Sequence, residues 1–345
     1  MRQLPLPIIA VLTAVLATGC GSETKDTAST GAASESSMVT VYTGRHYGIE
    51  PVFDAFTAAT GIEVRFTTGK DPELRERLEA EGKNTPADVL MAADAGNLAM
   101  AADADLLAAT SSPKIDAAVP ANLRDADGRW TALSRRARVI MVSERVDEAE
   151  QPTTYAGLGD PKWRKRLCLR PATHPYTQSL VSSMIIAEGS EQAEVTAAAW
   201  VANEPFFIDS DTEILEALMA GECDVAVTNS YYLARMTKEQ GAVPVRLVWP
   251  EQDAGQRGVH INISGAGVTT HAPNPAGAQR FIEWLATDGQ AEFAEVNLEF
   301  PADPTVEPDP ILVAWGEFRP DPVDVSEFGP VQPEAVKLLD RVGYR

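Results

Sequence analysis

The sequence is poor in the side chains that form common metal sites. It has three cysteines and four histidines in 345 residues. The histidines, His46, His174, His260 and His271, are far apart, and no Cys/His cluster of short spacing is present, so a zinc site of the usual kind is not predicted. Calcium-binding loops of the Asp-x-Asp-x-Asp-Gly kind are also missing.

Basic residues are scarce as well. The chain has 29 Lys and Arg residues against 50 Asp and Glu, a net charge of -21. Loss of a leader that contains Arg2 leaves 28 basic residues, and 28 minus 50 gives about -22. This balance argues against binding to nucleic acid or adhesion to anionic lipid. It is compatible with attraction of a cation, although many exported proteins are acidic.

The signatures of common enzymes are missing too. The chain has no Gly-x-Ser-x-Gly, P-loop or Rossmann fingerprint. No 2-His-1-carboxylate triad of an iron-dependent oxygenase can be assembled with a clear spacing. There is no solenoid repeat and no coiled coil. We therefore predict a protein that is not an enzyme.

The N-terminus has the pattern of a lipoprotein leader. A short positive start precedes the apolar stretch Leu4 to Leu16, which is too short for a stable membrane span, and Leu-Ala-Thr-Gly-Cys20 follows. Residues 1–19 are predicted to be the signal peptide, Cys20 the lipidated residue and 20–37 a flexible tether. The alternative is ordinary secretory cleavage, with Cys20 incidental. No later segment is apolar enough to span a membrane.

The other two cysteines, Cys168 and Cys223, lie in apolar, strand-like segments. An exported compartment permits a disulfide between them, and two buried free thiols are the alternative.

The remaining chain, about 300 residues from Met38, is long enough for two domains. Its apolar patterns alternate between strands and helices, which predicts an α/β fold with a parallel, covered sheet. The predicted strands are 38–43, 61–69, 87–91, 134–142, a segment at Leu167, 224–228 and 258–268. The predicted helices start at Ile49 and cover 71–81, 178–188, 214–221, 275–289 and a short C-terminal segment.

Two adjacent tyrosines stand out at one strand end. Tyr231 and Tyr232 follow the apolar run Asp224 to Thr228 and precede a helix-forming segment from Leu233. Ligands of α/β sheets bind beyond the carboxyl ends of strands, although an aromatic pair at a strand end can also simply pack. Two more predicted loops follow strands and contain tyrosine or histidine. His46 and Tyr47 lie after the first strand, and Tyr176 lies in the loop 171–177.

Several motifs together resemble one family. They are the lipobox, Gly44-Arg45-His46-Tyr47, Thr85-Pro86-Ala87-Asp88-Val89, Asp94 to Leu98, Ser134-Arg135-Arg136-Ala137-Arg138-Val139, Leu158 to Trp163, Asn229-Ser230-Tyr231-Tyr232 and Gly265-Ala266-Gly267-Val268. In this order they resemble the ferric-iron-binding proteins of ABC importers, the FutA/FbpA type. The resemblance covers Val39 to about Ala294 and the leader.

The resemblance implies a two-lobed periplasmic-binding-protein fold of type II, a clamshell with hinge crossovers near Ala137 and Asn262. Residues 38–137 with about 265–300 would form the first lobe, and 138–264 with about 301–345 the second. It also implies a monomer outside the cytoplasm, anchored by lipid, that delivers iron to the permease and ATPase of an ABC transporter. The implied iron ligands are His46, Tyr47, Tyr176, Tyr231 and Tyr232.

This ligand set suits iron on chemical grounds. Fe3+ is a hard, triply charged ion that favours charged oxygen ligands, so phenolates are appropriate, although Fe2+ stays open. Arg45, Arg135 or Arg136 could balance surplus negative charge or hold an anion. An alternative on the same fold is a binding protein for an organic solute such as a polyamine or a sugar. Asp94 is predicted chiefly to cap a helix at the rim of the cleft, with a functional role as the alternative. His174 is predicted to lie in an exposed loop, with a place on the cleft wall as the alternative. His260 is predicted to lie in a strand near the hinge and His271 at the surface.

Overall fold

A computed structural model describes residues 37–45 and 48–345. The leader with Cys20, and the predicted ligands His46 and Tyr47, lie outside the described residues. Within the described part of the chain, no helix is long and apolar enough to cross a membrane.

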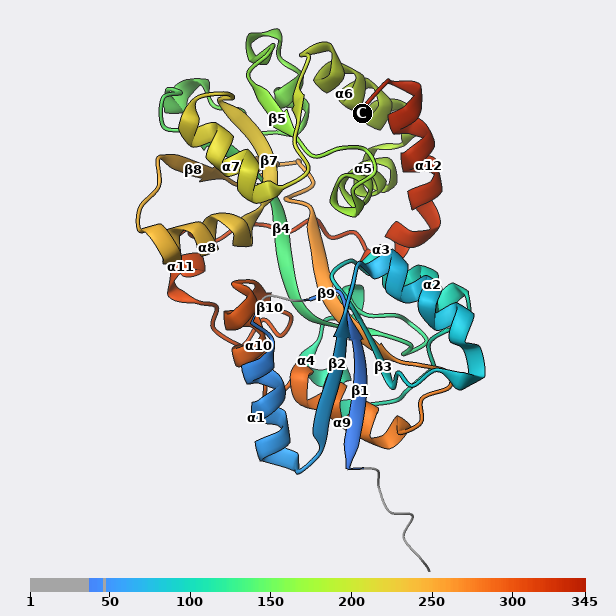
Figure 1. Ribbon diagram of the computed structural model, residues 1–345. Coiled ribbons are helices and arrows are strands. Elements are labelled where there is room, and N and C mark those ends of the chain that lie inside the picture. Colours follow the sequence, from blue (N-terminus) through green and yellow to red (C-terminus); the bar gives the residue numbers. More distant parts are fainter. Residues whose placement is uncertain (1–36, 46–47) are drawn as a thin grey trace, which may run out of the picture. The chain divides into compact units, whose positions relative to one another are not determined.

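The strands form a sheet in the order β2-β1-β3-β9-β4-β7-β5-β6, and β8 and β10 also pair with β4 (Figure 1). As predicted, β1 pairs in parallel with β2 and β3, and β5 pairs in parallel with β7 and with β6, a strand that was not predicted. The sheet is nevertheless mixed and not wholly parallel as predicted, because β9 is antiparallel to both β3 and β4. The strands are β1 (Met38–Thr43), β2 (Glu63–Thr68), β3 (Val89–Ala92), β4 (Thr131–Ser143), β5 (Leu167–Leu169), β6 (Phe206–Phe207), β7 (Val225–Asn229), β8 (Val245–Val248), β9 (Ile261–Val268) and β10 (Phe300–Pro301).

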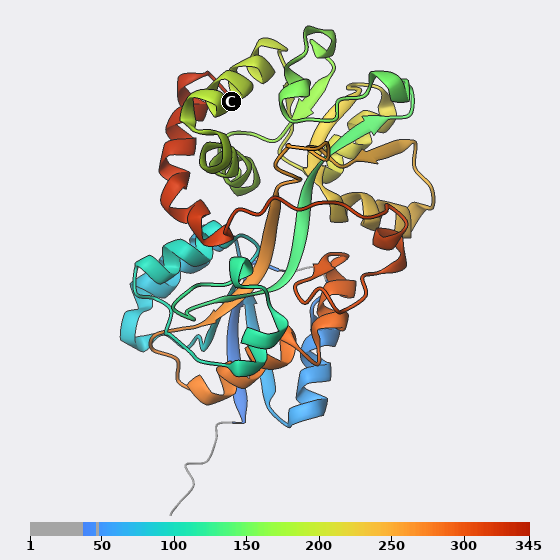
Figure 2. The ribbon, with the colours of Figure 1, turned by 180° about the vertical axis from the view of Figure 1, so that it is seen from behind.

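Two antiparallel strands, β4 and β9, connect the halves of this sheet (Figures 1 and 2). The first part of β4, as far as Ala137, pairs with β9, whereas Arg138 and the residues after it pair with β7 and β8. Side chains of β4 are buried along almost its whole length, so both faces of the strand are covered by protein. These strands are the crossovers of the two-lobed fold.

The helices cover the sheet. They are α1 (Glu50–Thr60), α2 (Asp71–Glu81), α3 (Ala95–Asp103), α4 (Pro113–Ala118), α5 (Pro175–Glu188), α6 (Ser190–Ala202), α7 (Asp211–Ala220), α8 (Ser230–Gln240), α9 (Pro275–Ala286), α10 (Gln290–Asn297), α11 (Pro310–Val313) and α12 (Phe328–Arg341). The bounds of α2 match the prediction. The single helix predicted over 275–289 is wrong, because α9 ends at Ala286 and α10 starts after Gly289, which packs directly against the ring of Trp284.

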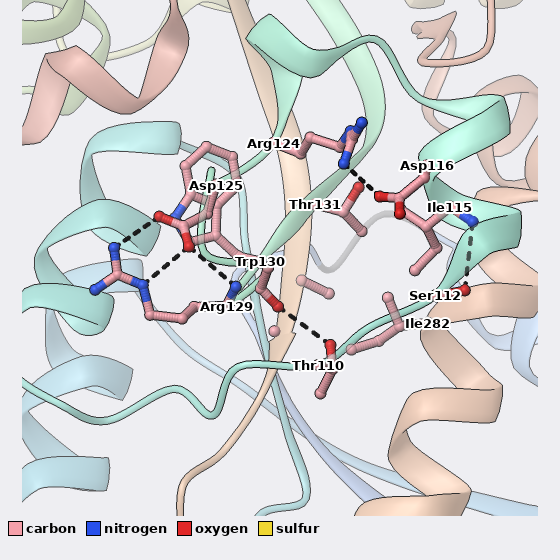
Figure 3. A pocket seen from close by; sticks show the side chains of 13 residues that line it. Thr110, Ser112, Ile115, Asp116, Arg124, Asp125, Arg129, Trp130, Thr131 and Ile282 are labelled. Carbon is pink, nitrogen blue, oxygen red and sulfur yellow. Dashed lines mark hydrogen bonds and ion pairs between the residues drawn. The ribbon is translucent and has the colours of Figure 1, made fainter.

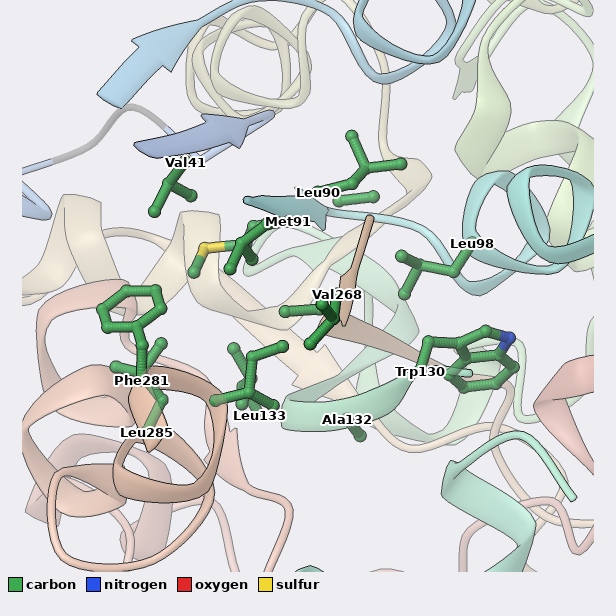
Figure 4. Packing of buried hydrophobic residues seen from close by; sticks show 14 of the residues in the cluster. Val41, Leu90, Met91, Leu98, Trp130, Ala132, Leu133, Val268, Phe281 and Leu285 are labelled. Atoms are coloured by element: carbon green, nitrogen blue, oxygen red, sulfur yellow. The ribbon is translucent and has the colours of Figure 1, made fainter. Parts of the chain in front are cut away.

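One hydrophobic cluster, here called the first core, surrounds β1, β3 and the start of β4. Val41, Leu98 and Phe281 are among its buried members (Figure 4). The second core contains Ile140, Leu180 and Trp200, on the other half of the sheet. Helix α12 belongs to both cores, because Phe328 lies in the first and Leu338 and Leu339 in the second.

The structure joins Cys168 of β5 and Cys223, just before β7, in a disulfide, with the two Cα atoms 6.0 Å apart. Both residues are fully buried. The disulfide therefore ties β5 to the strand that leads to the tyrosine pair.

Candidate metal centre

Three tyrosines meet at the N-termini of two helices. Strand β7 ends at Asn229 and α8 starts at once, so Tyr231 and Tyr232 lie in the first turn of that helix. Tyr176 lies in the first turn of α5 and not in the predicted loop, because His174 caps the helix and Pro175 occupies its first position. Helix N-termini favour negative charge, so both turns are suitable places for phenolates.

The phenol groups are close together. The Oη atoms of Tyr176 and Tyr231 are 3.2 Å apart, within hydrogen-bonding distance. The rings of Tyr231 and Tyr232 stack with centroids 4.2 Å apart. Tyr231 is completely buried, whereas Tyr176 and Tyr232 are half-buried. The tyrosine pair predicted from the sequence therefore lies beside the third predicted tyrosine.

The two contacting phenols are protonated in this arrangement. Burial raises the pKa of both Tyr176 and Tyr231 well above the ordinary value of 10.0, and the neighbouring phenol raises each further. The guanidinium groups of Arg45 and Arg136 act in the opposite direction and lower both pKa values. The site thus contains guanidinium groups that favour phenolates. Without a bound metal ion, however, the effect of burial on the two pKa values is larger.

Arg45, which follows β1, reaches the tyrosines from the first half of the sheet. Its guanidinium carbon lies 5.4 Å from the ring centre of Tyr231. Its Nη2 forms a buried ion pair of 2.5 Å with Glu299, and its Nε donates to Asn297. The other carboxylate oxygen of Glu299 accepts hydrogen bonds from Ser134 and Ser264. The position of Arg45 is therefore fixed by a charge of opposite sign.

Arg136, on β4, faces the tyrosines without such a partner. Its guanidinium lies 5.1 Å from the ring centre of Tyr176, and its Nη2 donates to the carbonyl of Ala93. Its Nε and Nη1 have no hydrogen-bond partner, although the side chain is only 1 % exposed. Within the described residues it forms no ion pair with a carboxylate, so its charge is available to the site.

The third predicted arginine, Arg135, is not brought to the tyrosines. Neighbouring side chains of a strand point to opposite faces, and Arg135 instead donates its Nε to the carbonyl of Pro301. Burial lowers its pKa.

A cavity of about 1060 Å³ lies beside the tyrosines and is lined by both halves of the sheet. Gly44, Arg45 and Asp71 contribute from one half, and His174, Tyr176 and Tyr232 from the other. The wall of the cavity carries charges of both signs. Its cationic side chains are Arg45, Lys70, Arg75 and Arg170, and its acidic side chains are Asp71, Glu73 and Asp209.

For two residues of this cavity the role favoured from the sequence is wrong or incomplete. His174 is not an exposed loop residue: it is half-buried, its ring lies 4.4 Å from that of Tyr176, and burial lowers its pKa to about 3. Asp71 was interpreted only as a helix start. Burial, and next the charge of Asp94, raise its pKa to about 7, and its Oδ1 has no hydrogen-bond partner. Only the Asp-Pro pair at a strand end marked this position.

Other sites do not compete with the tyrosines. Among the described residues, no group of three His, Cys, Asp or Glu side chains is placed to hold a metal ion. A second cavity, around Thr110, Asp125 and Trp130, measures only about 30 Å³ (Figure 3). It has room for about one or two water molecules. A third cavity, of about 260 Å³, is lined by Arg235, Lys238, Glu239, Glu295, Val296 and Leu298. It is about a quarter of the size of the cavity at the tyrosines, so a ligand site in the described part of the chain is best sought at the tyrosines.

Comparison with known proteins now identifies the family. The family model described as bacterial extracellular solute-binding protein matches residues 52–320. The chain belongs to this family. The solute-binding protein is 38% identical to iron uptake protein A2 of Synechocystis sp., over 91% of its own length and 92% of the relative. It is 30% identical to the major ferric iron-binding protein of Neisseria meningitidis, over 89% of its own length and 93% of the relative.

Solved structures agree with these relatives. The FutA protein of Trichodesmium, in complex with iron and citrate, superimposes with a TM-score of 0.83 and 38% identity, covering 89% of this chain and all of the other. The solute-binding protein therefore has the two-lobed type II fold, and its relatives are binding proteins rather than enzymes. The predicted resemblance is confirmed.

Proposed function

We propose that this protein binds ferric iron between its lobes through tyrosine and histidine side chains and delivers it to the permease of an ABC transporter. One observation carries the proposal: Tyr176, Tyr231 and Tyr232 converge at two helix N-termini, beside buried arginines. The names of the relatives, iron uptake and ferric iron-binding proteins, support the same cargo.

Phenol oxygens select for a hard cation. When a phenol becomes a ligand it loses its proton, because coordination favours the charged form. Three phenolates match the charge of Fe3+. The unpaired charge of Arg136 leaves room for one further negative ligand, either Tyr47 or an anion. Fe2+ would leave the same ligand set with surplus negative charge, so Fe3+ is favoured.

The proposed ligands His46 and Tyr47 come from the loop after β1. Support for their role comes from Arg45, the residue before them, which lies over the ring of Tyr231. In the mechanism we propose, Tyr176, Tyr231 and Tyr232 take up the ion first, and His46 and Tyr47 bind it when the lobes close. Stronger binding to the closed form shifts the population toward that form. Protonation of the phenolates, reduction, or opening by the permease would release the ion.

The proposal extends to the organisation of the chain. The first lobe comprises 38–137 with about 265–300, and the second 138–264 with about 301–345. Lipid on Cys20 would hold the protein, as a monomer, at the outer side of the cell membrane. Detergent partition of the wild type and of a Cys20→Ala variant tests the anchor, and equal partition would contradict it.

Ferric loading tests the central proposal. Ferric phenolate has a visible charge-transfer absorption, so the loaded protein should be coloured and should melt at a higher temperature. Tyr231→Phe and Tyr232→Phe should each weaken or shift the band. The matched control is Tyr42→Phe, because the hydroxyl of Tyr42 instead binds Glu81 at the edge of the first core. A colourless protein with unchanged melting, stabilised instead by a polyamine or sugar, would reject iron and favour the organic-solute alternative.

A further inference from the structure

Asp94 makes more hydrogen bonds than a helix cap requires. It was predicted to cap α3, and its Oδ1 does accept from the backbone and side-chain nitrogens of Asn97, at 3.0 and 3.2 Å. Its Oδ2 binds elsewhere: it accepts from the hydroxyl of Ser179 at 2.5 Å and from the amide of Asn262 at 2.8 Å. The carboxylate is 1 % exposed, so these four bonds form away from water.

The three partners belong to different parts of the fold. Asn97 lies in α3, which packs into the first core, and Asn262 lies in the crossover strand β9. Ser179 lies in α5, whose apolar residues pack into the second core. A single oxygen of Asp94 therefore connects the hinge to a helix of the opposite core. The amide of Asn262 also accepts from the backbone nitrogen of Ala95, which fixes the same helix end to the hinge a second time.

Ser179 is one helical turn beyond Tyr176. Residues three apart in a helix lie on the same face, so the bond to Ser179 acts on the turn that presents the phenol. The neighbouring residue, Gln178, accepts a hydrogen bond of 2.5 Å from Gln332 of α12, the helix that belongs to both cores. The N-terminal part of α5 is thus held by two polar contacts, one to Asp94 at the start of α3 and one to α12.

We propose that Asp94 is a positioning residue for the metal site: its bond to Ser179 sets the place of Tyr176 relative to the first lobe and is formed when the lobes are closed. This inference rests on the proposed function. Because a hydrogen bond to a charged group is stronger than a neutral one, and because this bond is buried, its loss should favour the open form.

Two serines of α5 give a matched pair of variants. Ser179→Ala removes the hydroxyl that binds Asp94, whereas Ser182→Ala removes an equally buried hydroxyl whose oxygen has no hydrogen-bond partner. We expect Ser179→Ala to weaken ferric binding about tenfold, measured by competition with a chelator. The band of the loaded protein should also shift, because Tyr176 moves. Ser182→Ala should change affinity less than about twofold.

Two further variants separate positioning from simple stability. Ser179→Thr restores a hydroxyl and should recover most of the affinity. Asp94→Asn keeps an oxygen for the cap of α3 but places two amide groups, its own and that of Asn262, against each other, and should weaken binding as Ser179→Ala does. Equal ferric affinity in Ser179→Ala and Ser182→Ala, or no rescue by threonine, would overturn the inference.

A measurement without metal keeps this test independent of the proposed function. In the metal-free protein, closed molecules are in equilibrium with open ones, and loss of the bond lowers the closed fraction. Amide hydrogens in the first turns of α5 should therefore exchange faster in Ser179→Ala than in Ser182→Ala. A wild type that shows no ferric band would contradict the proposed function, and equal exchange in the two variants would contradict the role of Asp94.

Discussion

The phenol oxygens of Tyr176 and Tyr231 lie 3.2 Å apart although their residues are 55 positions apart in the sequence. The two helices that carry them start after β5 and β7. These strands pair in parallel, so their carboxyl ends lie at the same edge of the sheet. Two phenols in contact repel each other when both are charged, so both lose their protons only when a metal ion binds between or beside them. The distance therefore couples ligand binding to the loss of protons.

Proton release should accompany iron binding. The pKa values of Tyr176 and Tyr231 are raised above 10.0, so both phenols are protonated at neutral pH and must lose their protons to become ligands. We expect release of about two protons from this pair for each iron bound, which by itself lowers the affinity about a hundredfold per pH unit of acidification. A pH-stat titration with a ferric chelate, corrected for the chelate alone, measures both.

The control for this titration is the double variant Tyr176→Phe/Tyr231→Phe. Its proton release should be lower than that of the wild type by about two protons per iron. If both proteins released equal numbers of protons, the two phenols would not be ligands.

Replacing Glu299 should destabilise the fold strongly. Glu299→Gln leaves the guanidinium of Arg45 buried without its ionic partner, at 2 % exposure. Loss of one partner of a buried pair costs about 3–5 kcal/mol. Urea unfolding of the metal-free protein measures the change. Glu63→Gln is the control, because Glu63 pairs with Arg65 at the surface, where such a change costs less than about 1 kcal/mol. Similar losses in the two variants would contradict the structural role of the Arg45–Glu299 pair.

His260 should make the fold sensitive to acid. Burial lowers its pKa well below 6.5, and nearby arginines lower it further. Below pH 6.5 the unfolded chain therefore binds a proton that the folded chain does not, and stability falls by about 1.4 kcal/mol per pH unit for this residue. His174, whose pKa is about 3, contributes in the same direction. His260→Asn should remove about half of their combined slope between pH 6 and 5, measured by urea unfolding.

The matched control is His271→Asn, because His271 is exposed. This variant should keep the slope of the wild type. An unchanged slope in His260→Asn would show that His260 titrates in the same way in the folded and the unfolded chain.

The disulfide should stabilise the fold without affecting the metal site. Cys168 and Cys223 close a loop with a sequence separation of 55, for which loop entropy predicts about 4 kcal/mol. We expect the variant Cys168→Ser/Cys223→Ser to have a free energy of unfolding that is lower by this amount, as measured by urea unfolding. The variant should keep its ferric band. Reduction of the native protein should have the same effect, and reductant should not affect the variant. Two free thiols in the native, unreduced protein would contradict the bond.

Local patterns were sufficient for much of the fold. The Asp-Pro start defined α2 at Asp71, and the apolar run before the tyrosine pair identified β7. The start of α5 was missed because His174-Pro175 resembled a loop, whereas proline is well suited to the first position of a helix. Tyr231 and Tyr232 could be proposed because they follow a predicted strand, whereas Tyr176 was proposed from the resemblance to the ferric-iron-binding proteins.

The connections between distant residues could not be predicted in the same way. Asp94 was expected chiefly to cap α3 at the rim of the cleft, since nothing local indicates its bonds to Ser179, 85 residues away, and Asn262, 168 residues away. Likewise, Arg135 and Arg136 are equivalent in sequence, and only the pairing of β4 shows that Arg136 faces the tyrosines. Which of two neighbouring side chains reaches the site depends on which face of the strand points toward it, and this follows from the pairing of distant strands.

The way the two cores share the chain has a consequence for biosynthesis. The first core extends from Val39 to Phe328, and the second contains Leu338 and Leu339 near the C-terminus. The first core therefore waits for the start of α12, and the second core waits for the rest of this helix. A nascent chain keeps part of its apolar strands exposed until α12 has been made, which gives chaperones or an export machinery time to engage it before it folds.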